Sequence, residues 1–163
     1  MSDHVRMTGG LEPRSGWEAT ECSIANALEI VGTRSAFLLL REAVYGTTRF
    51  DDFAERAGLS EPVAATRLRE LVEHGLLERE PYREPGQRTR HGYRLTAMGI
   101  DLMPVLTALM QWGDRWLPEH GAYVKLRHRD CGERVEAQLR CAAGHDVGLS
   151  EIDLAATPKA RHQ

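Results

Sequence analysis

Two groups of residues in the middle of this chain have the side-chain chemistry needed to contact nucleic acid. In the first group, small and basic residues share one face of a helix that we expect to begin at Ser60. Small residues let a helix approach a groove closely, while threonine and arginine reach base edges or phosphates. Pro62, Ala65, Thr66 and Arg69 lie on that face, Arg67 lies to one side of it, and Ser60 is at the N-cap position. The alternative is a solvated surface on which the two arginines pair with nearby Glu70 and Glu73.

The second group is a cluster of arginines around Pro85-Gly86. From Arg83 to Arg94 the chain has four arginines and a single acid, Glu84. Extended segments flank this cluster, which is typical of a β-hairpin with the arginines at its tip. Such arginines contact phosphates or probe the minor groove, whereas on a plain surface hairpin they only aid solubility. The predicted DNA contacts of this cluster are Arg83, Arg88 and Arg90, and Arg34 is included with them.

The elements that position both groups follow from hydrophobic periodicity. Apolar residues recur at helical spacing ahead of Ser60 and after it. The expected helices are Cys22–Val31, the segment from Thr33 to Gly46, the segment from Phe50 to Ala57-Gly58, and the segment from Ser60 to Gly75. The inward face of the last helix consists of Ala64, Leu68, Leu71 and Val72. Helix, turn, helix and hairpin in this order predict a winged helix-turn-helix, which is mainly α with a small β-wing.

A long helix capped by Thr96 follows the hairpin, and Pro104 is expected to kink or divide it. Its apolar surface is larger than a thin domain can cover, and a two-fold homodimer is the usual partner of such a face. The residues expected at the subunit contact are Ile24, Leu28, Leu106, Leu109, Trp112 and Trp116. The alternative is that this helix packs entirely against its own domain.

The composition is that of an ordinary soluble protein, with 42% hydrophobic and 28% charged residues in a chain of 163. No apolar run approaches the ~20 residues that span a membrane, and the N-terminus has no signal-peptide core. We therefore expect no membrane partner and a cytoplasmic location. The net charge of −3 argues weakly against a nucleic-acid partner. The sequence shows no paired carboxylates, nucleophile elbow or phosphate loop, so no enzyme is expected.

Four parts are expected along the chain. Residues 1–19 form a flexible N-terminal arm, and 20–118 form the winged helix-turn-helix DNA-binding and dimerisation domain. Residues 121–154 form a small β-rich, hairpin-like C-terminal extension, and 155–163 form a disordered tail.

The C-terminal extension contains a candidate zinc site. Residues 135–139 alternate apolar and polar side chains, which predicts a strand. His128 and Cys131 precede this strand, and Cys141 and His145 follow it. Four such ligands fit tetrahedral zinc, which would also stabilise so short a segment. Against zinc, these pairs are not the usual two-cysteine knuckles, and a small hairpin with chance cysteines explains the same letters.

With these residues in view, the chain resembles the HxlR family of bacterial transcription regulators, relatives of the MarR group. The resemblance runs from Cys22 to about Leu117. It is carried by LLLREAVYGTTRFDDF (residues 38–53), RLREL (67–71), GLLER (75–79), YRLT (93–96) with Gly99, and the segment from Pro104 to Trp112-Gly113. It implies a homodimer that binds an inverted-repeat operator, as a repressor that answers a small-molecule effector or a redox signal. The helix from Ser60 would enter the major groove, and the wing would contact flanking backbone.

Some positions depart from the family pattern. Ser23 stands where a proline is common, and Ser35 where a tryptophan is usual. These two changes affect packing and sensing. Pro62 stands where the family often has a polar or basic residue, and Ala65 where it often has a threonine. These two changes leave base specificity open.

Cys22 matches a cysteine that senses oxidants or electrophiles in some members of this family. Its position at a helix N-terminus favours thiol reactivity, which neighbouring Glu21 opposes. The alternative is a small buried residue in the subunit contact. For the whole chain, the competing hypothesis is a winged-helix module that recognises protein without binding DNA, which the acidic net charge permits.

Overall fold

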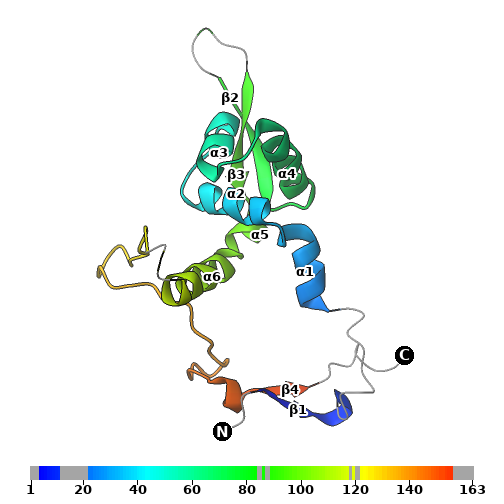
Figure 1. The fold of residues 1–163 in the computed structure, drawn as a ribbon, viewed down its shortest axis with the longest axis vertical. Helices are drawn as coiled ribbons and strands as arrows, with labels where there is room; N and C mark the ends of the chain where they lie inside the picture. Colours follow the sequence, from blue (N-terminus) through cyan, green and yellow to red (C-terminus); the bar gives the residue numbers. More distant parts are fainter. Residues whose placement is uncertain are drawn as a thin grey trace. The chain divides into compact units, whose positions relative to one another are not determined.

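The structure, a computed structural model, describes residues 4–11, 22–83, 86, 89–117, 119 and 122–155. The chain divides into two compact units, Ser23–Ala137 and Met1–Cys22 with Gln138–Gln163, each described by itself. In the larger unit the described elements are α1 (Ser23–Val31), α2 (Arg34–Val44), α3 (Phe50–Ala57), α4 (Glu61–Glu73), β2 (Leu77–Tyr82), β3 (Arg90–Leu95), α5 (Ala97–Ile100) and α6 (Met103–Trp116) (Figure 1). The smaller unit contains β1 (Arg6–Thr8), β4 (Asp153–Ala155) and short 3-10 helices at Gly9–Leu11 and Leu149–Glu151.

The core of the larger unit is built around α2. Ala36, Leu39 and Leu40 on this helix have no exposed surface, and α2 packs against α3, α4 and β3. Phe53 of α3 is equally buried and meets the ring of Tyr93 edge-on, with ring centroids 5.9 Å apart. The arrangement of helix, turn, helix and hairpin confirms the predicted winged helix-turn-helix.

The predicted turn at Gly58 and the predicted N-caps at Thr33 and Thr96 are present. Gly58 ends α3 with a φ of 62°, a conformation that glycine adopts without strain. The Thr33 hydroxyl accepts the backbone N–H of Ala36 at 3.2 Å, and the Thr96 hydroxyl accepts that of Gly99 at 3.2 Å. The long C-terminal helix is divided into α5 and α6, with Pro104 in the first turn of α6. Pro104 is well placed there because the first turn of a helix needs no donor from it.

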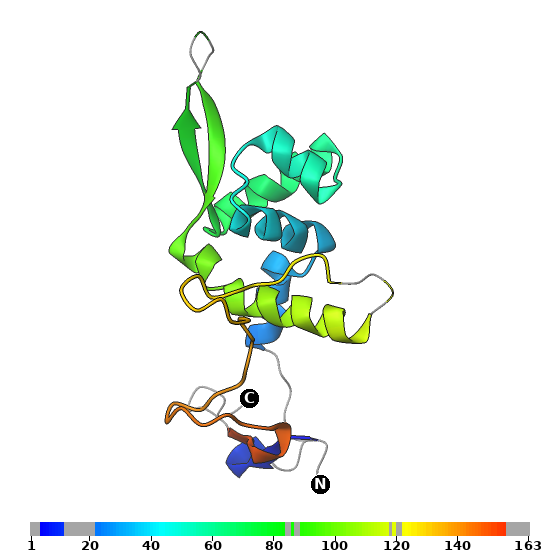
Figure 2. The same cartoon turned by 90° about the vertical axis from the view of Figure 1, so that its left-hand side faces the viewer.

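The wing is an antiparallel hairpin of β2 and β3 that extends beyond the helices (Figure 2). Its register runs from Leu77 opposite Leu95 to Tyr82 opposite Arg90. The hairpin joins the helical part where the backbone N–H of Tyr93 donates to the Thr48 carbonyl at 2.8 Å. A Cβ atom on Gly92 would lie 3.1 Å from that carbonyl oxygen, so the close approach favours glycine.

The smaller unit differs from the expected flexible arm, because Arg6–Thr8 pairs in parallel with Asp153–Ala155. Two hydrogen bonds of 2.7 Å join the Arg6 guanidinium to the Asp153 carboxylate. The hydrogen bond from Arg6 lowers the pKa of Asp153 below its ordinary value. In the described residues no single helix is long and apolar enough to cross a membrane, although α1 and α2 together, bent by 77°, pass on length and composition.

The strand predicted over residues 135–139 is wrong. The extension has isolated bridges, Arg127 with Arg134 and Arg140 with Asp146, but no ladder over 135–139. Backbone hydrogen bonds of 3.0 Å join Val135 to Leu126 and Leu139 to Val147 at the two ends of this segment, and the Gln111 side chain of α6 bonds the part between them. Its amide donates to the Val135 carbonyl at 2.7 Å and accepts the Ala137 N–H at 3.0 Å. Alternating side chains here therefore reflect an extended segment bound to a helix.

A buried carboxylate links α2 to the loop before α3 and, through it, to the last turn of α3. Glu42 is 5% exposed. One of its oxygens accepts two hydrogen bonds from Arg41, at 2.6 and 3.0 Å. The other accepts the Thr47 hydroxyl at 3.3 Å, which in turn accepts a bond from Arg56 at 3.1 Å. The orientation of α3 therefore depends on this acidic side chain.

Replacing Glu42 with Ala should lower the free energy of unfolding by about 1–3 kcal/mol, because buried donors lose their acceptor. Urea denaturation followed by circular dichroism measures this loss. Glu55→Ala, an exposed change on α3, is the matched control and should change stability by less than about 0.5 kcal/mol. Equal losses in the two variants would contradict the structural role of Glu42.

Candidate nucleic-acid interface

The outer face of α4 is the candidate surface for nucleic acid. Ala64 and Leu68 of this helix are fully buried and Leu71 is 1% exposed, so α4 is fixed to the core along one side. Pro62, Ala65, Thr66 and Arg69 are exposed on the other side. The structure thus places these four predicted residues on one accessible face.

The N-terminus of α4 presents a second polar group. Ser60 occupies the N-cap position, and its side chain forms no capping hydrogen bond. An exposed hydroxyl beside unbonded N–H groups suits a phosphate. Glu61 in the first turn opposes an anion there, so this end of the helix is suited to one backbone contact rather than to a dedicated anion site.

The two arginines of α4 are not equivalent. The Arg67 side chain is 25% exposed and forms an ion pair with Glu70, and its Nε is buried without a hydrogen-bond partner among the described residues. The Arg69 side chain is 58% exposed, and its Nε lies 3.8 Å from the Glu73 carboxylate. The pairs Arg67–Glu70 and Arg69–Glu73, which the solvated-surface alternative predicts, are therefore both present. Because an exposed pair at that distance contributes little, Arg69 can leave Glu73 for a partner more readily than Arg67 can leave Glu70.

The arginines of the wing are placed in different ways. Arg83 and Arg90 are exposed where the two strands separate, whereas Arg88 lies outside the described residues. Arg94 forms a cross-strand ion pair with Glu80. Arg34 is exposed at the first position of α2.

One exposed residue of α4, Val63, was not predicted from the sequence to contact DNA. Val63 is 45% exposed although it is a large apolar residue in a helix whose inward face is already complete. An apolar side chain on a groove-facing surface suits the methyl group of thymine. The signal was available, because a turn of about 100° per residue places Val63 closer to Thr66 than to Leu68.

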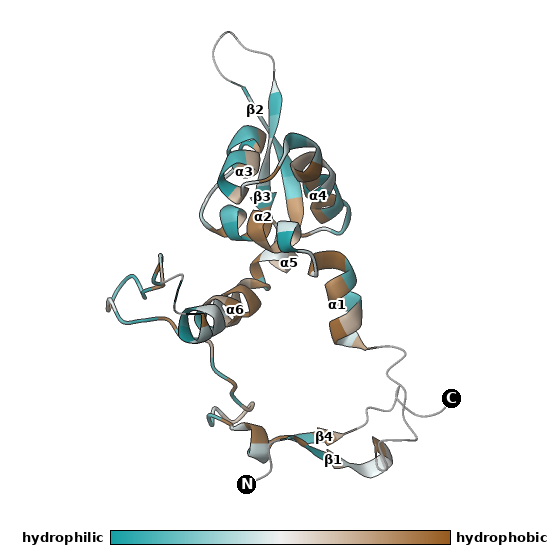
Figure 3. Cartoon of the chain, in the orientation of Figure 1, coloured by the Kyte–Doolittle hydropathy of each residue, from teal (hydrophilic) through white to brown (hydrophobic). Residues whose placement is uncertain are grey.

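A second accessible surface is apolar. Ile24 and Leu28 of α1 are 70% and 53% exposed, and Leu109, Trp112 and Trp116 of α6 are 52%, 56% and 59% exposed. Figure 3 shows that parts of both helices are hydrophobic. Leu106 is different, since it is partly buried against the core of its own unit. Five of the six residues predicted for a subunit contact are thus accessible.

The candidate metal and redox residues lie outside the helix-turn-helix. His128 Nδ1 is 3.1 Å from Cys131 Sγ. Hydrogen bonds from the backbone of His145 first, and then of Ala143, lower the pKa of the Cys141 thiol. In the part of the chain that the structure describes, no three His, Cys, Asp or Glu residues form a metal-holding group. The zinc site stays a prediction. Cys22 is a partly exposed free thiol directly before α1.

Known proteins resemble this chain in sequence and in fold. Residues 30–121 match the family model described as HxlR-like helix-turn-helix. Rv3095 of Mycobacterium tuberculosis, an uncharacterized HTH-type transcriptional regulator, is 47% identical over 132 residues, or 80% of this chain and 82% of its own. The crystal structure of PA1607, a candidate transcription factor, matches with a TM-score of 0.70 and 34% identity, covering 80% of this chain and 91% of PA1607. The redox regulator HypR in its oxidized form matches with a TM-score of 0.53 and 25% identity, covering 58% of this chain and 96% of HypR.

Proposed function

The chain belongs to the HxlR-like helix-turn-helix family of transcriptional regulators, and from this premise we propose that it is a homodimeric repressor of an inverted-repeat operator. The observation that carries the proposal is the exposed outer face of α4, which is slim at its N-terminus and carries Thr66 and Arg69 further along. A helix of this kind enters the major groove with its small residues closest to the bases.

The residues of this interface have separate roles in the proposal. Thr66 and Val63 contact base edges and thymine methyl groups, and Arg69 contacts guanine or a phosphate. Arg83 and Arg90 of the wing bind backbone phosphates, which fix the position of the protein without reading sequence. Ser60 adds a phosphate contact at the helix N-terminus.

Arg69→Ala should weaken operator binding by roughly 5- to 150-fold, the range for losing one good arginine contact. The measurement is a gel-shift titration with DNA from upstream of the gene itself, at fixed salt because affinity depends steeply on salt. Arg129→Ala, an exposed arginine in the extension, is the matched control and should bind as the unchanged protein does.

Arg67→Ala separates the two roles that α4 arginines can have. Because Arg67 is paired and half-buried, this change should lower the free energy of unfolding by at least as much as it lowers the free energy of DNA binding.

If Arg69→Ala leaves the shift unchanged while the protein binds DNA, α4 is not the helix that contacts the bases. If no DNA shifts and a protein partner is recovered, the competing module that recognises protein is favoured.

The dimer part of the proposal rests on the apolar residues of α1 and α6. Exposed tryptophan, leucine and isoleucine side chains at this density on α1 and α6 are typical of an association surface. A two-fold dimer would also present two α4 helices to half-sites one turn of DNA apart, about 34–36 Å. One copy alone would contact too few phosphates for specific binding.

Leu28→Asp should convert the dimer into a monomer, because a charge in an apolar contact is left unpaired when buried. Light scattering coupled to size exclusion measures the mass directly. Leu149→Asp, equally exposed at 50% but outside α1 and α6, should leave the mass unchanged. A monomeric unchanged protein would contradict the dimer.

Cys22 is our candidate for a redox signal. The likeness to HypR, which is named a redox regulator, supports this role, as does the position of the free thiol directly before α1. Cys131 and Cys141 are also free and exposed, so an oxidant reaches all three thiols.

In a Cys131→Ser/Cys141→Ser protein, diamide should release DNA, and a reductant should restore the shift. The same treatment of the protein that also carries Cys22→Ser should have no effect. Release of DNA from the triple variant would exclude Cys22 as the sensor.

A further inference from the structure

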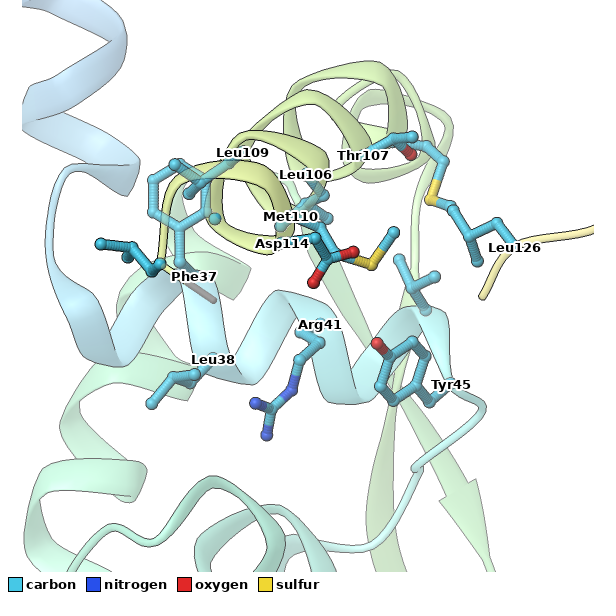
Figure 4. Close-up of a pocket in the computed structure, with 14 residues that line it drawn as sticks. Phe37, Leu38, Arg41, Tyr45, Leu106, Thr107, Leu109, Met110, Asp114 and Leu126 are labelled. Carbon is cyan, nitrogen blue, oxygen red and sulfur yellow. The ribbon is translucent and has the colours of Figure 1, made fainter. Parts of the chain in front are cut away.

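A cavity of about 340 Å³ lies between α2 and α6 in the larger unit. Phe37 of α2 points toward Leu106 and Met110 of α6 (Figure 4), and Leu38 also lines the cavity. A volume of this size with mostly apolar walls and few polar groups is typical of a small-molecule site. None of the contacts proposed for DNA uses this cavity.

The polar groups of the cavity define what could bind. Thr107 is 5% exposed and lines the wall, where its hydroxyl can donate or accept a hydrogen bond. The Asp114 carboxylate lies between α6 and α2 (Figure 4), and none of the described residues forms an ion pair with it. A hydroxyl or ammonium group of a ligand is therefore a favourable partner for Asp114.

The cation that lines the cavity is already neutralised. Arg41 is ion-paired with Glu42 at 2.6 Å and donates to the Arg56 carbonyl at 3.3 Å. Its guanidinium points away from α6 (Figure 4). A ligand carboxylate would therefore meet the Asp114 charge without a free arginine to balance it, so anions are disfavoured.

The C-terminal extension supplies one wall. Leu126 lines the cavity from a segment that follows the residues matched to the family model, 30–121. Gln111 donates a hydrogen bond to the Val135 carbonyl and accepts one from the Ala137 N–H, and these two bonds hold the segment on α6. The extension thus has a role that does not require a metal, since it covers one side of the cavity.

From these contacts we propose that the cavity between α2 and α6 binds a mostly apolar small molecule that carries a hydroxyl or amino group and no carboxylate. This molecule is the effector, an assignment that rests on the proposed function. Its binding would change how closely α6 packs against α2. Because α3 and α4 pack on α2, the position of α4 and the affinity for DNA would change as well. A second copy of the chain is the competing occupant, because Leu109 at the rim also belongs to the proposed subunit contact.

The test is isothermal titration calorimetry of the full chain with three probes of equal ring size: 2-naphthol, 2-naphthylmethylamine and 2-naphthoate. We expect the first two to bind at least tenfold more tightly than the carboxylate. Asp114→Asn should remove most of this difference, because the charge that repels the carboxylate and attracts the amine is lost.

Leu126→Trp should fill the cavity and abolish binding of all three probes. Val124→Trp, 41% exposed and two residues away, does not line the cavity and is the control. Circular dichroism verifies that both variants fold. Absence of binding to the unchanged protein, equal affinity for the three probes, or full binding by Leu126→Trp would overturn the site. Binding that appears only in Leu28→Asp would assign the cavity to the second copy.

The effector role is read separately, from the DNA shift with and without 2-naphthylmethylamine. We expect at least a fivefold change in DNA affinity, absent in Leu126→Trp. Probe binding without this change, in a protein that shifts DNA, would overturn the effector role. If the protein shifts no DNA at all, the proposed function fails while the calorimetric result on the cavity still stands.

Discussion

Complete burial of one side of α2 is the constraint on which the DNA-reading unit depends. Ala36, Leu39 and Leu40 have no exposed surface, and α3, α4 and β3 all pack on this helix. Because α4 is fixed along its inner face, its outer face is fixed as well. The buried Glu42 carboxylate then links α2 to Thr47 and through it to Arg56, so the packing and the polar network together set the orientation of the helix-turn-helix.

The proposed DNA binding depends on where the arginines lie and not on the net charge of the chain. The net charge is −3, and several arginines of the unit are engaged within the chain: Arg41 with Glu42, Arg67 with Glu70, and Arg94 with Glu80. The residues proposed to contact DNA are a small set on the outer face of α4 and on the wing. Affinity from so few phosphate contacts requires two copies, which gives the exposed apolar residues of α1 and α6 their place in the proposal.

Most of the helix-turn-helix could be predicted from the sequence because its signals are local. Helical periodicity, the Thr33 and Thr96 caps, the Gly58 turn and the break at Pro104 each depend on residues a few positions apart. The features that could not be predicted depend on distant partners. The strand Arg6–Thr8 has its partner 147 residues away, and the extended segment at 135–139 pairs with a glutamine side chain. The half-burial of Arg67 depends on packing around α4, and the cavity depends on the distance between α2 and α6.

The regulator therefore has three features: the outer face of α4, the exposed apolar residues of α1 and α6, and the cavity between α2 and α6. A ligand in this cavity would contact α2, the helix on which α4 packs. A DNase I footprint of the unchanged protein on its upstream region tests the central claim most directly, since it reports where the reading helices lie. A homodimer on an inverted repeat should protect two half-sites related by a two-fold axis, with centres about 10–10.5 base pairs apart or a multiple of that spacing. A single unpaired half-site, or uniform weak protection without sequence preference, would contradict it.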